Sequence, residues 1–203
     1  MPCGLCYTDL GGDTEFMQLT DKTILFLGSS VTYGSAAGGC SFVDIIRDEC
    51  GCTCIKEAVS GTTLADINET SYVSRLRAVD KDMHLDLFVC QLSTNDAKKK
   101  IELCKVEEAI RTILDHVREF FGCPVVFYTG TRYKCDEYER MIELLYGLKN
   151  EYGFEILDLF NDEDMLKVSD GDYQRYMKDP VHPTLLGYKE WWTPKFIEFL
   201  ERI

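Results

Sequence analysis

The sequence predicts an α/β fold, a three-layer α/β/α sandwich built on a five-stranded parallel sheet. Short apolar runs alternate with segments of helical periodicity along most of the 203 residues. Strands that alternate with helices form parallel sheets, and right-handed crossovers place the helices on both faces. The chain contains no internal repeat, linker or low-complexity segment. Residues 23–203 are therefore predicted to form one domain, and residues 1–22 an N-terminal extension.

Five apolar runs of strand length are bounded by polar or turn-forming residues. The run Leu-Asp-Leu-Phe-Val-Cys-Gln-Leu is apolar enough to occupy a central place in a sheet that is covered on both faces. In chain order, the predicted strands are residues 23–27, 54–59, 85–92, 124–129 and 154–160.

Four segments have helical patterns. In residues 105–121, apolar side chains recur every three or four positions and form one wide stripe. Because proline has no backbone N–H, we expect Pro194 to bend the last helix. The predicted helices are residues 41–49, 105–121, 136–152, and 184 to the C-terminus.

The composition argues against two kinds of partner. A net charge of −13 opposes binding to a nucleic-acid backbone. No apolar run reaches the roughly 18 residues that a membrane span requires. The first residues, MPCGLCYTDLGGDTEF, have neither a basic start nor an apolar stretch, so we predict no signal peptide and expect a cytoplasmic protein.

Ten cysteines are many for a chain of this length. Without a signal peptide, reduced thiols are expected rather than disulfides. Cys3 and Cys6 have the spacing of a metal or redox pair, but no second such pair accompanies them, which argues against structural zinc. Cys50, Cys52 and Cys54 would share one face of a strand. We therefore expect no metal site and interpret the cysteines as buried, reduced, small hydrophobic residues.

Polar segments follow the predicted strands at the edge where open parallel sheets bind ligands. Residues 28–30 (Gly-Ser-Ser) follow the first strand, residues 60–62 (Ser-Gly-Thr) the second, and residues 93–96 (Ser-Thr-Asn-Asp) the third. Residues 179–182 (Asp-Pro-Val-His) follow the fifth. A serine, a histidine and an aspartate are the groups that acyl transfer requires, so the sequence predicts a hydrolase.

With these segments in this order, residues 23–203 resemble the SGNH hydrolases, also called the GDSL esterase/lipase family. That family has a Gly-Asp-Ser segment, a glycine, a Gly-x-Asn-Asp segment and an Asp-x-x-His segment, which correspond here to residues 28–30, Gly61, residues 93–96 and residues 179–182. The resemblance implies a flavodoxin-like topology. Two positions depart from the pattern, since Ser29 replaces the aspartate and Ser93 the glycine.

The resemblance implies a role for each residue of the site. Ser30 is the expected nucleophile, His182 the general base and acid, and Asp179 the group that orients the imidazole. Small-acyl carbohydrate esters, simple lipid esters or thioesters are the implied small-molecule substrates, and no cofactor is implied. The expected oxyanion hole consists of the backbone N–H groups of Ser30 and Gly61 and the side-chain amide of Asn95.

Other polar residues have weaker assignments. Tyr33, Arg132 and Tyr133 are placed to contact substrate, although aromatic side chains near strand ends more often serve packing. His84 precedes the third strand, at the opposite edge of the sheet, and His116 flanks the apolar stripe of a helix.

Two other functions stay open. Residues 28–34 could hold a phosphate at a helix N-terminus in a flavodoxin-like, flavin-binding module. The chain could also be a catalytically degenerate family member, with Ser29 and Ser93 reflecting lost activity. Individual residues also have structural alternatives: Ser30 as a helix cap, Gly61 as a turn glycine and Asn95 as a loop cap. If strand alternation continues, Ser29 points away from Ser30.

Overall fold

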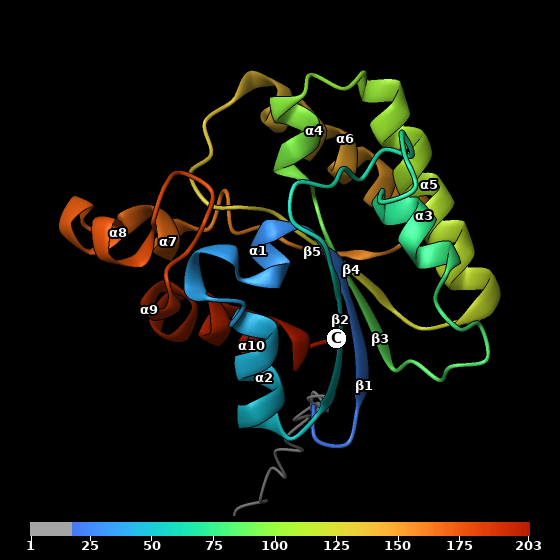
Figure 1. Ribbon diagram of the computed structural model, residues 1–203, viewed down its shortest axis with the longest axis horizontal. Coiled ribbons are helices and arrows are strands. Elements are labelled where there is room, and N and C mark those ends of the chain that lie inside the picture. Colours follow the sequence, from blue (N-terminus) through green and yellow to red (C-terminus); the bar gives the residue numbers. More distant parts are fainter. Residues whose placement is uncertain (1–17) are drawn as a thin grey trace, which may run out of the picture.

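The computed structural model describes residues 18–203, and its centre is one parallel sheet (Figure 1). The strand order is β2-β1-β3-β4-β5, and every pair of neighbours is parallel. The predicted fold class and the five-stranded parallel sheet are therefore confirmed. The strands are β1 (Thr23–Gly28), β2 (Thr53–Ala58), β3 (Leu87–Gln91), β4 (Val125–Tyr128) and β5 (Glu155–Leu157).

Side chains alternate between the two faces of the sheet, and each face has its own apolar core. Along β1, Leu25 and Leu27 belong to one core, and Ile24 and Phe26 belong to the other. All four side chains are fully buried. Burying one such side chain contributes about 1.5–3 kcal/mol relative to leaving it exposed, so packing stabilises the sheet from both sides.

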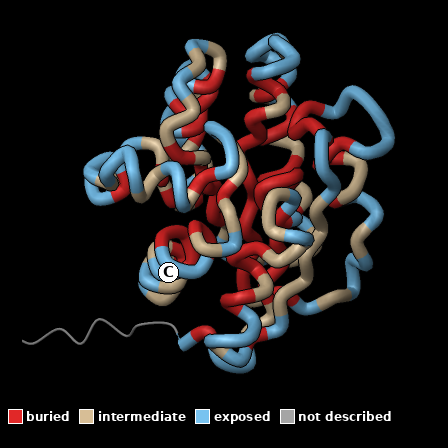
Figure 2. The backbone as a smooth tube through the Cα atoms, turned by 60° about the vertical axis from the view of Figure 1, so that its left-hand side comes forward, coloured by how far each residue is buried: buried red, intermediate tan, exposed pale blue. Residues whose placement is uncertain are grey.

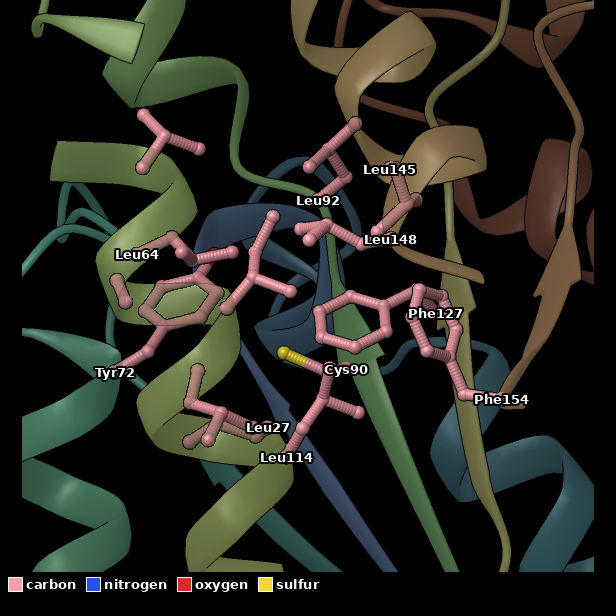
Figure 3. Close-up of a cluster of buried hydrophobic side chains, with 14 of the residues drawn as sticks. Leu27, Leu64, Tyr72, Cys90, Leu92, Leu114, Phe127, Leu145, Leu148 and Phe154 are labelled. Atoms are coloured by element: carbon pink, nitrogen blue, oxygen red, sulfur yellow. The ribbon is translucent and has the colours of Figure 1, made fainter. Parts of the chain in front are cut away.

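The first core lies between the sheet and three helices (Figure 3). The predicted apolar stripe belongs to the longest of them, α5, which packs against α3 and α6 in this layer. Figure 3 shows Tyr72 and Leu64 in the same cluster as Cys90 of β3 and Phe127 of β4. The helices of this layer are α3 (Tyr72–Arg77), α5 (Leu103–Phe120) and α6 (Asp136–Tyr152).

The second core lies under α2 (Phe42–Cys50) and α10 (Thr193–Leu200) on the other face. The rings of Phe42 and Phe196 stack with their centroids 3.9 Å apart and join these two helices. Buried backbone is concentrated at the centre of the molecule, and the segments around it are exposed (Figure 2). The helices thus form two outer layers around the sheet.

The predicted strands agree with the structure to within a few residues, and α6 agrees at both ends. The third strand begins two residues later than predicted. Asp86, directly before it, is engaged by the start of β1, since its carboxylate accepts the Thr23 N–H and the Lys22 ammonium. Several helices were not predicted, since so few residues show no periodicity. They include α1 (Ser30–Tyr33), α4 (Thr94–Lys98), α7 (Glu163–Lys167), α8 (Asp170–Tyr176) and the 3₁₀ turn η1 (Ser35–Ala37).

The C-terminal helix differs from the single bent helix that the sequence predicts. It is divided into α9 (Leu185–Gly187), a π-helical turn η2 (Tyr188–Trp192) and α10. In the π turn the N–H of Thr193 bonds to the carbonyl of Tyr188, five residues back. Pro194 then falls in the first turn of α10, where a missing N–H is tolerated. The wider turn therefore precedes the proline.

The eight cysteines of the described region are free thiols, but only Cys52 and Cys90 are buried. The interpretation as buried hydrophobic residues is wrong for the others, since Cys104 is exposed and five are half-buried. Cys50 ends α2 and so does not share a strand with Cys54. Cys3 and Cys6 lie outside the described residues. In residues 18–203, no three or more His, Cys, Asp or Glu side chains are grouped to hold a metal ion.

Within the same residues, none of the helices combines the length and the apolar character that crossing a membrane requires.

Candidate active site

The candidate site lies where the order of the strands reverses. From β1 the chain runs outward to β2 and then returns past β1 to β3. The connections from β1 and β3 leave the sheet in opposite directions at such a switch point, and α/β proteins bind ligands in the crevice between them. Ser30 follows β1 and Asn95 follows β3, so two predicted site residues flank this point.

Ser30, His182 and Asp179 form a hydrogen-bonded chain, although Ser30 and His182 are 152 positions apart. The Oγ of Ser30 lies 2.7 Å from Nε2 of His182. The other ring nitrogen, Nδ1, lies 2.8 Å and 3.0 Å from the two carboxylate oxygens of Asp179. An imidazole in this arrangement can accept the serine proton while its second N–H donates to the carboxylate.

The Asp179 carboxylate is held by its own loop. Its Oδ1 accepts the backbone N–H groups of Val181 at 2.8 Å and His182 at 2.9 Å. Burial raises the pKa of Asp179, but these two N–H groups and the imidazole outweigh burial and hold the pKa below its ordinary value. The carboxylate is therefore charged at neutral pH, which favours a proton on Nδ1 and leaves Nε2 as an acceptor.

The loop of residues 178–182, which carries Asp179 and His182, is fixed at both ends. Met177 and Pro183 form an antiparallel bridge, and the Lys178 N–H donates to the carbonyl of His182 at 2.8 Å. Beyond the loop, the buried hydroxyl of Tyr188 donates to the carbonyl of Val31 at 2.7 Å. Val31 is the residue after Ser30. This bond therefore joins the C-terminal helical segment directly to the turn after β1 that carries Ser29 and Ser30, called the serine turn below.

Gln91, the last residue of β3, holds the serine turn by hydrogen bonds. Its side-chain oxygen accepts the Ser29 N–H at 2.9 Å, the Thr32 hydroxyl at 2.9 Å and the Ser29 hydroxyl at 3.3 Å. Ser29 is fully buried, and its hydroxyl contacts Gln91 while that of Ser30 contacts His182. The two serine hydroxyls therefore have different partners. The turn also requires glycine at position 28, because a Cβ there would lie 1.7 Å from the Thr32 hydroxyl.

Gly61 occupies the turn after β2 with φ +80, a backbone conformation that favours glycine. A Cβ at this position would meet no atom within 4 Å, so the dihedral angle and not the space restricts the residue. Its carbonyl accepts the ammonium group of Lys99 at 3.0 Å. In the part of the chain that the structure describes, the Gly61 N–H has no hydrogen-bond partner.

Asn95 and Ser93 lie at the start of α4. The Asn95 side-chain amide donates one N–H to the carbonyl of Thr62 at 2.8 Å, and its second N–H bonds to no group in residues 18–203. Ser93 is the N-cap of α4, where its hydroxyl accepts the Asn95 N–H at 3.2 Å. The departure at position 93 thus orders the first turn of the helix that carries Asn95.

Asp96 has hydrogen-bond partners outside its own helix. Its carboxylate accepts the N–H groups of Leu64 at 2.8 Å and Ala65 at 2.9 Å. Asp96 therefore joins α4 to the connection that follows Gly61. Burial raises the pKa of Asp96 above its ordinary value, although hydrogen bonds from Ser93 and from these two N–H groups oppose the effect.

The three residues predicted to contact substrate differ in their surroundings. Tyr33 is 45% exposed at the end of α1, close to Ser30. Arg132 instead donates to the carbonyls of Met165 at 3.0 Å and Val168 at 2.9 Å, and so holds the end of α7. Tyr133 packs edge-to-face on Tyr138, with the centroids 5.6 Å apart. Arg132 and Tyr133 therefore contact other groups of the protein, whereas the Tyr33 ring is exposed to solvent.

The two other histidines lie outside the hydrogen-bonded chain of Ser30, His182 and Asp179. His84 is exposed ahead of β3, and His116 lies on α5 against the ring of Phe120. Gln91 is a site residue that was not predicted, although a polar residue inside an apolar strand indicates a buried side chain that needs partners. A buried side-chain amide requires hydrogen-bond partners, which such a residue finds in the neighbouring turns.

A parallel sheet between two helical layers, with polar side chains gathered beyond the carboxyl ends of its strands, is an arrangement found in α/β hydrolases. The chain belongs to the GDSL-like lipase/acylhydrolase family, whose model matches residues 26–190. Membership of this family supports esterase or acylhydrolase activity. No curated protein matches the chain significantly.

Solved structures share the fold at low sequence identity. A protein from Lactobacillus plantarum superposes with a TM-score of 0.75 at 19% identity, over 90% of this chain and 97% of that one. A member of the lipolytic protein G-D-S-L family from Veillonella parvula has a TM-score of 0.71 at 16% identity, over 89% and 99%. The acetyl xylan esterase AlAXEase has a TM-score of 0.71 at 13% identity, over 88% and 99%.

Proposed function

We propose that this chain is a serine esterase that cleaves carboxylic esters through an acyl-enzyme, with Ser30 as the nucleophile. The observation that carries the proposal is the 2.7 Å contact between Ser30 Oγ and His182 Nε2, with Asp179 on the opposite ring nitrogen. A serine hydroxyl is a weak nucleophile until an adjacent base takes its proton. Membership of the acylhydrolase family supports the same reaction class.

In the first half of the reaction, Ser30 Oγ attacks the ester carbonyl carbon while its proton moves to His182 Nε2. The carbonyl oxygen becomes negative, and the N–H groups of Ser30 and Gly61 and the Asn95 amide stabilise it. The ester C–O bond then breaks, and His182 returns the proton to the leaving alcohol. Asp179 stays ionised and stabilises the imidazolium.

In the second half, His182 takes a proton from water, and the resulting hydroxide adds to the carbonyl carbon of the acyl group on Ser30. The bond between this carbon and Ser30 Oγ breaks, His182 protonates Oγ, and the carboxylic acid leaves. No cofactor is needed in either half. One base thus serves both halves because the imidazole is neutral again after each one.

Small-acyl carbohydrate esters are the first substrates to test, followed by simple lipid esters and thioesters. An acetyl xylan esterase shares the fold, and acetylated sugars combine a small acyl group with a polar alcohol. The exposed ring of Tyr33 lies at the end of the helix that Ser30 begins. We propose Tyr33 as a contact for the alcohol part, since aromatic rings commonly pack against such ligands.

The test compares two neighbouring serines with p-nitrophenyl acetate as the substrate. Ser30→Ala removes the nucleophile and is expected to lower kcat by roughly 10⁴-fold or more. Ser29→Ala is the matched control and should keep much of the activity, because the Ser29 hydroxyl contacts Gln91 and not His182. Equal activity in the parent and in Ser30→Ala would contradict the proposal.

Labelling with a fluorophosphonate separates an active hydrolase from a degenerate one. The reagent forms a covalent bond only with an activated serine, so the parent should label at Ser30 and Ser30→Ala should not. A folded parent that fails to label would favour lost activity. A flavin absorption band in the purified protein would favour the flavodoxin-like alternative.

A further inference from the structure

Arg75, on α3, is a cation with little exposed side chain beside the candidate site. Its side chain is 9% exposed, and its Nε donates to the carbonyl of Thr70 at 3.0 Å. The terminal nitrogens donate to the carbonyls of Gly28 and Glu57, both at 2.8 Å, to the Glu57 carboxylate at 3.0 Å and to the Thr62 hydroxyl at 3.3 Å. A guanidinium has five N–H groups, and here each one has an acceptor.

Two of these acceptors belong to the turns that carry proposed oxyanion donors. The Gly28 carbonyl ends β1, two residues before Ser30, and it also accepts the Val59 N–H at 3.3 Å. Thr62 directly follows Gly61 at the end of the neighbouring turn. One terminal nitrogen of Arg75 donates to both Gly28 and Thr62, so a single rigid group spans the two turns.

The surroundings of the guanidinium suit arginine and not lysine. Its central carbon lies 5.2 Å from the centroid of the Tyr72 ring, which fixes the plane of the fork. Tyr72 is itself fully buried in the first core (Figure 3). The Glu57 carboxylate offsets the cost of burying the charge. A lysine has only three donors on a flexible stem and cannot reproduce the fork.

We infer that Arg75 is a positioning residue for ester hydrolysis, which fixes the distance between the Ser30 and Gly61 N–H groups by binding both of their turns. The inference rests on the proposed function. These donors act on charge that develops in the transition state, so displacing them should lower kcat more than it changes KM. A misplacement of about 1 Å can cost about 10²-fold in rate.

The experiment measures p-nitrophenyl acetate hydrolysis and fluorophosphonate labelling in Arg75→Lys. We expect kcat to fall by about 10- to 100-fold with KM changed less than about threefold, and the labelling rate to fall in parallel. Arg77→Lys is the matched control on the same helix, since Arg77 is 54% exposed and its hydrogen bond goes to the Asp66 carboxylate. Arg77→Lys should keep kcat within about twofold, as expected for an exposed surface pair.

A second pair of variants covers the case in which Arg75→Lys does not fold. Thr62→Val removes, at nearly constant volume, the hydroxyl that accepts from Arg75 at 3.3 Å and donates to the carbonyl of Val59 at 2.7 Å. This variant should lower kcat in the same way, whereas Thr62→Ser restores the hydroxyl and should recover most of the loss. Unchanged kcat in folded Arg75→Lys, or in Thr62→Val, with an active parent would overturn this inference alone. A parent that neither hydrolyses the ester nor labels would overturn the proposed function and this inference together.

Discussion

Asp179 keeps its negative charge when the candidate site is mildly acidified. Burial raises its pKa, and the N–H groups of Val181 and His182 and the imidazole lower it by more, so the pKa lies below the ordinary value. A carboxyl group whose pKa is lowered by folding stabilises the folded state at every pH above its ordinary pKa. This contribution is lost only as the pH falls through the lowered pKa. Asp179 therefore stays charged at every pH at which imidazoles titrate.

We predict that kcat/KM for p-nitrophenyl acetate falls as the pH is lowered from about 8 to about 5, and that a plot of log(kcat/KM) against pH approaches a slope of one at the acid end. In this range a histidine gains a proton and no longer acts as a base, while Asp179 adds no second step. A pH series with the unfolding temperature measured at each point checks the prediction. A rate that stays constant across this range in the folded protein would contradict a role for His182 as the base.

At the scale of elements, α4 is a short helix in which two successive residues form hydrogen bonds with the connection after β2. Asn95 donates to the Thr62 carbonyl, and the next residue, Asp96, accepts two buried backbone N–H groups. Neighbouring residues of a helix point in different directions, so the pair holds two separate points of the loop. The helix thus fixes the turn that contains Gly61.

We predict that Asp96→Ala lowers the free energy of unfolding by about 2–4 kcal/mol, because the N–H groups of Leu64 and Ala65 lose their acceptors in a buried place. Burial also raises the pKa of Asp96, so its ionised form costs stability as the pH rises, and this cost offsets part of the loss. Urea unfolding measures the difference.

Asp96→Asn should lie between the parent and Asp96→Ala, since one oxygen remains as an acceptor. Asp115→Ala, on the exposed side of α5, is the matched control and should stay within about 0.5 kcal/mol of the parent. An Asp96→Ala variant as stable as this control would show that water satisfies the two N–H groups.

The strands, and the segments that meet in the candidate site, could be predicted because each has a local pattern. Buried strands are apolar runs, and Ser30, Asp179 and His182 stand in short motifs at strand ends. The partners of Gln91 and Arg75 could not be predicted in this way, since the turns that they bind lie 62 and 47 positions away along the chain. Contacts of this kind depend on the strand order, which a single sequence does not show.

At the scale of the whole molecule, one sheet separates two cores of different composition. Both tryptophans of the chain, Trp191 and Trp192, belong to the core under α2 and α10. The opposite core contains tyrosine and phenylalanine but neither tryptophan. Tryptophan fluorescence therefore reports on one layer, whereas far-UV circular dichroism reports on the helices of both.

We predict that fluorescence and circular dichroism give coincident urea transitions, because the strands of residues 23–203 contribute side chains to both cores and so couple the two layers. Phe42→Ala should lower the free energy of unfolding by about 3–5 kcal/mol and move both transitions to the same lower urea concentration. The reason is that Phe42 packs against five aromatic rings, including Phe26 on β1 and Phe196 on α10. A fluorescence transition that moves alone, with the circular dichroism split into two steps, would show that the layers unfold separately. The region would then consist of two folding units and not of the single domain that the sequence predicts.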